Sequence, residues 1–146
     1  MGSNFFLERK FKTWITPQSK EFGRLFPNIN SKTNVGLARE AAKEFNISIL
    51  LKGANSIVAD NKKVWQIFGT DSQTARAGLG DLLSGFVAGS SAIDLTFCRN
   101  ISTDFFAKYV LLHSFAASKC KSGSNASAIG DELTKLMRNI KTRQIS

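Results

Sequence analysis

Residues 74–85 read Thr74-Ala75-Arg76-Ala77-Gly78-Leu79-Gly80-Asp81-Leu82-Leu83-Ser84-Gly85, a run of small residues that leads into an apolar helical pattern. Glycine lets main-chain N–H groups come close to a ligand, and the first turn of a helix offers unpaired N–H groups at the positive end of its dipole. This pattern predicts a phosphate cradle at Gly78, Leu79 and Gly80. Asp81 would lie beside that phosphate, where its carboxylate could accept a proton from an attacking hydroxyl.

Composition indicates a folded chain whose basic charge is compatible with anionic ligands. It has 146 residues, 42% of them hydrophobic, which predicts one domain with a packed core. A net charge of +9 suits anionic ligands, although a solvated basic surface is the preferred explanation of this charge. No tight block of lysines and arginines with interleaved aromatics is present, so we expect no nucleic-acid partner.

Cysteine usage and the N-terminal residues predict a cytoplasmic location. Cys98 and Cys120 are far apart in the sequence and lack metal-ligand spacing, which is typical of free thiols in a reducing compartment. The first ten residues contain no apolar stretch of signal-peptide length, and the apolar segment 82–97 is short and contains Asp94. We therefore expect no membrane partner.

Hydrophobic spacing predicts an α/β fold with few strands. The expected strands cover 11–16 and 47–51, followed by a hairpin of 57–59 and 64–68 at a sheet edge. A short helix over 21–25 would have Thr16 as its N-cap and Pro17 at its first position. Further helices are expected over residues 33–45, 82–91, 104–119 and 126–140. A parallel sheet normally has more strands than these, so the chain is typical of the back half of a larger domain.

Three segments, in this order, resemble the NAD(P)H-hydrate dehydratases, which are ribokinase-like enzymes that use ADP or ATP to repair hydrated nicotinamide cofactors. Residues 15–25 (ITPQSKEFGRL) are similar to the family's T-P-H-x-x-E-F-x-R-L, and residues 51–58 (LKGANSIV) to its L-K-G-A-x-T motif and following strand. Residues 75–85 (ARAGLGDLLSG) are similar to A-R-G-G-S-G-D-V-L-x-G. Residues 112–117 (LHSFAA) are similar to a later L-H-G-x-A helix.

The resemblance implies a three-layer ribokinase-like α/β fold, present here as its C-terminal half over residues 1–146, with 1–10 and 141–146 expected to be flexible. It implies that Asp81 is the catalytic base at the hydrated nicotinamide and that the Gly80 amide meets the nucleotide phosphate. Gln18 would be a substrate contact. Contacts to the nucleotide would come from Lys52, Gly53, Ala54, Asn55 and Ser56.

The implied partners are an NADH or NADPH hydrate and an adenine nucleotide, ADP or ATP, with Mg²⁺ as an accompanying ion and no protein-held metal. In this family the nucleotide phosphorylates the ring hydroxyl, and loss of phosphate restores the cofactor. Because the family's domain is nearly twice as long, we also expect a homo-oligomer or pairing with a missing N-terminal half.

Three positions depart from the family pattern. Gln18 replaces a histidine that contacts the hydrate, and it forms hydrogen bonds but carries no positive charge. Ala77 and Leu79 replace a glycine and a small polar residue of the cradle. Two alternative functions therefore stay open, namely a small-molecule kinase of the same superfamily for a vitamin precursor or sugar, and a catalytically silent remnant that binds nucleotide. His113, the single histidine, lies in an apolar helical pattern and is expected to be a packed, hydrogen-bonded core residue.

Overall fold

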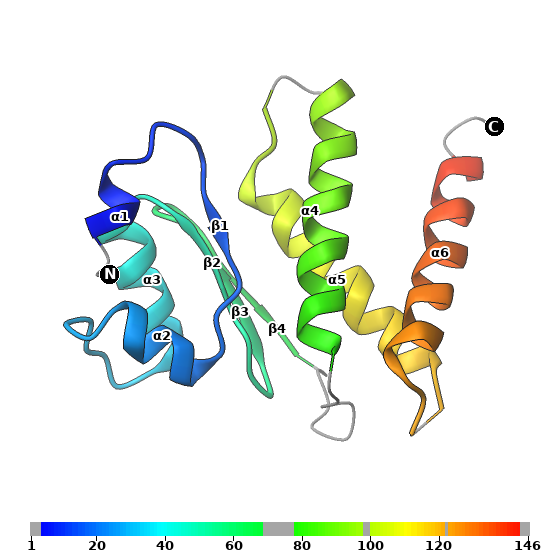
Figure 1. Ribbon diagram of the computed structural model, residues 1–146, viewed down its shortest axis with the longest axis horizontal. Coiled ribbons are helices and arrows are strands. Elements are labelled where there is room, and N and C mark those ends of the chain that lie inside the picture. Colours follow the sequence, from blue (N-terminus) through cyan, green and yellow to red (C-terminus); the bar gives the residue numbers. More distant parts are fainter. Residues whose placement is uncertain (1–3, 69–77, 98–99, 122, 144–146) are drawn as a thin grey trace. The chain divides into compact units, whose positions relative to one another are not determined.

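The computed structural model describes residues 4–68, 78–97, 100–121 and 123–143 (Figure 1). The chain divides into two compact units, residues 1–70 and residues 71–146. The first unit holds a sheet with three helices, and the second holds three longer helices.

The sheet of the first unit has four strands in the order β1-β2-β3-β4. They are β1 (Trp14–Ile15), β2 (Ser48–Leu51), β3 (Ser56–Ala59) and β4 (Val64–Ile67). Strand β1 runs parallel to β2, whereas β3 is antiparallel to both β2 and β4. The predicted buried strand and edge hairpin are therefore confirmed.

Strands β1 and β2 are parallel because two helices connect them. Helix α2 (Ser19–Leu25) and helix α3 (Asn34–Phe45) lie between the two strands in the chain, as a βαβ crossover requires. The hydroxyl of Thr33 caps α3 by accepting a hydrogen bond from the Gly36 N–H at 3.0 Å. Asn46 then ends the helix in the left-handed conformation, with φ of 49°.

The core of this unit lies between α3 and the sheet. Ala38, Ala41 and Ala42 on α3 are fully buried, so the helix approaches the strands closely. Phe22, Phe26 and Phe45 add aromatic packing, with ring centroids of adjacent pairs 5.0 Å apart. All four residues of β2 are buried, in agreement with the prediction of a strand covered on both faces.

The N-terminal part of this unit differs from the prediction in two respects. Helix α2 has Gln18 as its N-cap and begins at Ser19, so Thr16 is not the cap and Pro17 is not the first helical residue. The reason is that Gln18 is still extended after β1, and residues 17–18 continue the parallel pairing by contacting Lys52, the residue that follows β2. A short helix α1 (Asn4–Leu7), which we did not predict, precedes β1, and its Phe6 ring packs on Phe26 and Phe45.

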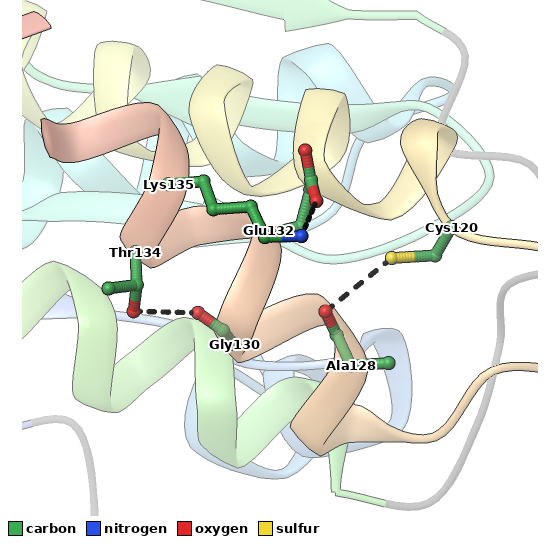
Figure 2. Close-up of polar contacts among 6 residues, drawn as sticks. All are labelled: Cys120, Ala128, Gly130, Glu132, Thr134 and Lys135. Atoms are coloured by element: carbon green, nitrogen blue, oxygen red, sulfur yellow. Dashed lines mark hydrogen bonds and ion pairs between the residues drawn. The ribbon is translucent and has the colours of Figure 1, made fainter. Parts of the chain in front are cut away.

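The second unit consists of α4 (Leu79–Phe97), α5 (Thr103–Lys119) and α6 (Ala126–Arg143). Helix α5 packs against both of the others. Ala116, Ala117, Ile129 and Leu133 form the buried centre between α5 and α6. Figure 2 shows the Cys120 thiol directed at the Ala128 carbonyl oxygen of α6, at 3.7 Å, while the internal contacts Thr134–Gly130 and Lys135–Glu132 lie along α6.

Helix α4 is longer than the predicted helix over residues 82–91. It extends to Phe97 because residues 92–97 contain no proline or glycine and α5 packs along the helix. The Tyr109 hydroxyl of α5 donates a hydrogen bond to the Asp94 carboxylate in this added part. Among the described helices, none combines the length and the hydropathy that a membrane span needs.

Candidate active site

Two of the predicted site segments meet at one end of the sheet in the first unit. Residues 17–18 follow β1, and Lys52 follows β2, so both leave the carboxyl ends of parallel strands. The Lys52 N–H donates a hydrogen bond to the Pro17 carbonyl oxygen at 3.0 Å, and Gln18 pairs with Lys52 in a parallel bridge. The carboxyl ends of parallel strands are where open α/β sheets bind their ligands.

The backbone at Gln18 is held in place by the helix that follows it. Its main-chain N–H donates a hydrogen bond to the Glu21 carboxylate at 2.7 Å, and its carbonyl accepts from the Phe22 N–H at 2.8 Å. The Gln18 side chain is exposed. Its exposure leaves the side chain accessible at this end of the sheet.

The nucleotide segment predicted from residues 52–56 divides into an accessible and a buried part. Lys52 is half-buried, and the three residues Gly53, Ala54 and Asn55 form an exposed turn between β2 and β3. Ser56 is only 6% exposed, as the first residue of β3. Direct contact with a ligand is thus available to residues 52–55, and Ser56 anchors the turn.

The predicted phosphate cradle forms the N-terminus of α4 in the second unit. Gly78 has φ of +84°, which a residue with a Cβ rarely adopts, and its carbonyl accepts the first helical hydrogen bond from the Leu82 N–H at 2.9 Å. The N–H groups of Leu79, Gly80 and Asp81 therefore precede the helical hydrogen-bond ladder. Asp81 is exposed in this first turn, directly after the residues predicted to hold phosphate.

The Leu79 side chain does not crowd this cradle. It packs against the hydrophobic cluster of Ala116, Ala117, Ile129 and Leu133, together with Leu82. Leu79 can thus offer its main-chain N–H to a phosphate while its side chain stabilises the contact of α4 with the rest of the unit. Ala77, the other departure from the family pattern, lies outside the described residues, as does the remainder of the stretch that precedes Gly78.

His113 is buried, as predicted, but its hydrogen bonding differs from the prediction. It is 8% exposed, and its Nε2 atom has no hydrogen-bond partner among the described residues. Burial lowers the pKa of its imidazole below the ordinary value of 6.5. His113 is therefore a neutral core side chain at pH 7.

The hydrogen bond between Tyr109 and Asp94 was not predicted. The spacing within either helix does not reveal it, because the two residues belong to different helices.

The described residues contain no group of three His, Cys, Asp or Glu side chains placed to hold a metal ion.

Comparison with known proteins gives the family context of these residues. Residues 3–141 match the family model described as NAD(P)H-hydrate dehydratase. The bifunctional NAD(P)H-hydrate repair enzyme Nnr of Gloeobacter violaceus is 41% identical over 81 residues, which is 55% of this chain and 16% of that protein. The ADP-dependent (S)-NAD(P)H-hydrate dehydratase of Nitrosopumilus maritimus is 40% identical over 78 residues, covering 51% of this chain and 27% of that protein.

A solved structure shares the fold. The ADP/ATP-dependent NAD(P)H-hydrate dehydratase of Bacillus subtilis, co-crystallised with ATP and Mg²⁺, aligns with a TM-score of 0.69 and 19% identity over 94% of this chain and 53% of that one. This confirms the predicted ribokinase-like α/β class. The present chain spans about half the length of that structure and at most 27% of the two curated relatives.

Proposed function

Because this chain belongs to the NAD(P)H-hydrate dehydratase family, we propose that it acts in the nucleotide-dependent dehydration of hydrated NADH or NADPH. The observation that carries the proposal is the junction of Gln18 with Lys52 at the carboxyl ends of β1 and β2. Two sequence motifs that lie more than thirty residues apart are thereby brought together at one accessible edge of the sheet, which supports a common binding role.

In this proposal each residue has the role that its family motif implies. Lys52, Gly53, Ala54 and Asn55 contact the adenine nucleotide, Ser56 holds the turn, and Gln18 contacts the hydrate. The main-chain N–H groups at Gly78, Leu79 and Gly80 receive the nucleotide phosphates, and Asp81 is the base. The exposure of Asp81 and of residues 53–55 supports these roles.

The reaction needs one base and one anion cradle. Asp81 accepts the proton of the ring hydroxyl while the hydroxyl oxygen attacks the terminal phosphorus of the nucleotide. The bond from that phosphorus to its bridging oxygen breaks, so AMP leaves from ADP, or ADP from ATP. Loss of inorganic phosphate and of one ring proton then restores the dihydronicotinamide double bond. N–H donors at the cradle stabilise the charge on the transferred phosphoryl group.

A Mg²⁺ ion would arrive with the nucleotide. Magnesium in phosphoryl-transfer sites is commonly held by one or two carboxylates together with substrate phosphates. The proposed partners are the NAD(P)H hydrate and ADP or ATP, together with a second copy of the chain or an N-terminal half that completes the domain.

The test is to mix the purified chain with hydrated NADH and either ADP or ATP and to follow the absorbance at about 340 nm, the band of the dihydronicotinamide. Recovery that requires the nucleotide would support the proposal. A flat trace from folded protein that still binds nucleotide would favour the silent remnant. A stable phosphorylated product without cofactor recovery would favour the kinase alternative.

A further inference from the structure

The first turn of α4 is anchored to the rest of the second unit by its own leucines. Leu79 and Leu82 both pack against the buried cluster that α5 and α6 form between them. They lie three residues apart, so they share one face of the helix. Gly78 and Asp81, in the same turn, are exposed. The turn therefore has an apolar side held by two other helices and a side that is open to a ligand.

Two further contacts fix the start of α4. A Cβ built on Gly78 would lie 3.8 Å from the Ala126 Cβ, so the turn lies directly against the first residue of α6. The Ser84 hydroxyl donates a hydrogen bond to the Gly80 carbonyl oxygen at 2.9 Å, which orients the peptide unit that follows Gly80. Of the three residues predicted to form the cradle, Gly78, Leu79 and Gly80, only Leu79 has a side chain that can anchor the turn by packing.

The leucine acts differently from the residue that the family pattern places here. A small polar residue could offer its own hydroxyl to a phosphate, whereas the Leu79 side chain has no polar group and packs inward. Only its main-chain N–H is available to an anion. Donors that are fixed before a ligand arrives bind it more tightly than donors that must be ordered on binding, because the conformational entropy was already lost on folding.

We propose that Leu79 is a positioning residue of the phosphate cradle. Its side chain, held by α5 and α6, keeps the main-chain N–H groups of residues 79–81 in place for the phosphates of ADP or ATP. This inference rests on the proposed function, because it takes the start of α4 as the phosphate site. It adds that nucleotide affinity depends on the packing of α4 against α5 and α6, and that bound nucleotide stabilises this packing in return.

Calorimetric titration of the whole chain with ADP tests this role. Leu79→Ser removes the anchor and introduces a hydroxyl, and it should raise the dissociation constant for ADP about tenfold. Leu79→Met keeps an apolar side chain of similar volume and should stay within about twofold of the wild-type chain. Leu136→Ser is the matched control, because Leu136 is also half-buried against the same cluster but lies further along α6 than Leu133. It should lower the free energy of unfolding to a similar extent and leave the dissociation constant unchanged.

A measurement without nucleotide separates the role of Leu79 from the proposed function. Amide NMR relaxation of the free chain reports the order of the Gly80 and Asp81 N–H groups, which should fall in Leu79→Ser and stay unchanged in Leu136→Ser. Circular dichroism would verify the helices, and Leu79→Ala would replace a serine variant that does not fold.

Two kinds of result would overturn the proposal. If the wild-type chain binds ADP, a dissociation constant that is unchanged or lower in Leu79→Ser, or raised equally in Leu136→Ser, would remove the role of Leu79 and leave the phosphate site standing. If the wild-type chain binds no ADP although its Gly80 and Asp81 N–H groups are ordered, the phosphate site itself would be contradicted, and this role with it.

Discussion

The main-chain N–H of Lys52 donates a hydrogen bond to the carbonyl oxygen of Pro17, with 3.0 Å between nitrogen and oxygen. This bond extends the parallel pairing of β1 and β2 by one step beyond the strands. It uses only main-chain atoms at residue 52, so it leaves the lysine ammonium group available to a ligand. The structural and the proposed binding roles of this residue can therefore be separated by mutation.

Replacing Lys52 with methionine should weaken nucleotide binding without unfolding the first unit. The main-chain bond to Pro17 and the length of the side chain are retained, while one positive charge beside an anionic ligand is lost. We expect the dissociation constant for ADP or ATP to rise about tenfold, measured by isothermal titration calorimetry. Lys62→Met, in the exposed turn between β3 and β4, removes the same charge away from the proposed site and should not change binding. An equal loss in both variants would indicate a general charge effect.

Replacing Asp81 with asparagine should abolish cofactor repair while nucleotide binding persists. Asparagine keeps the size of the side chain but cannot accept the hydroxyl proton, and loss of a general base costs about a hundredfold or more in rate. The measurement is recovery of the dihydronicotinamide band together with calorimetric titration of the nucleotide. Asp131→Asn, an exposed change on α6, is the control and should be silent. Undiminished turnover in the Asp81→Asn chain would remove Asp81 from the mechanism.

Replacing Gly78 with alanine should destabilise the chain at the start of α4. With φ of +84°, a Cβ at this position is strained by about 1–2 kcal/mol. Gly130→Ala is a contrasting control within α6, because its Cβ would make an ordinary 3.8 Å contact with the Leu82 side chain and remove a helical glycine. Urea denaturation should show a lower free energy of unfolding for Gly78→Ala and an unchanged or higher one for Gly130→Ala. Similar free energies of unfolding for the two variants would contradict the inference that a Cβ at position 78 is strained.

Local patterns in the sequence predicted most of the helices and strands. Residues Val35, Ala38, Ala42 and Phe45 recur at helical spacing, and helix α3 occupies this segment with Thr33 as its cap. The start of α2 was predicted wrongly because Thr16-Pro17 has the local signature of a helix start. The pairing of Gln18 with Lys52, a contact between distant residues, keeps the chain extended there instead. A tertiary hydrogen bond of this kind leaves no local signal.

The candidate site was predictable only in part. The motifs identified Lys52 and Asp81 as candidates, but they gave no information on which side chains are accessible. The burial of Ser56 follows from its pairing with Ile67 across β3 and β4, and the position of Leu79 follows from packing against α5 and α6. Both depend on contacts between different secondary-structure elements, which a motif does not encode. The roles assigned to these residues stay predictions until the variants above are measured.

The histidine provides a prediction about acid stability. His113 is the only histidine in the sequence, and burial lowers its pKa in the folded chain below the unfolded value of 6.5. The unfolded chain therefore binds more protons between these two pKa values, so the free energy of unfolding falls as the pH drops below 6.5. His113 contributes at most about 1.4 kcal/mol per pH unit to the change of the free energy of unfolding with pH, and above pH 6.5 this contribution vanishes.

His113→Gln should remove this part of the pH dependence, while any contribution of carboxylates at lower pH persists. Proton NMR of the single imidazole measures the pKa directly, and a value at or above 6.5 in the folded chain would contradict the burial of a neutral ring.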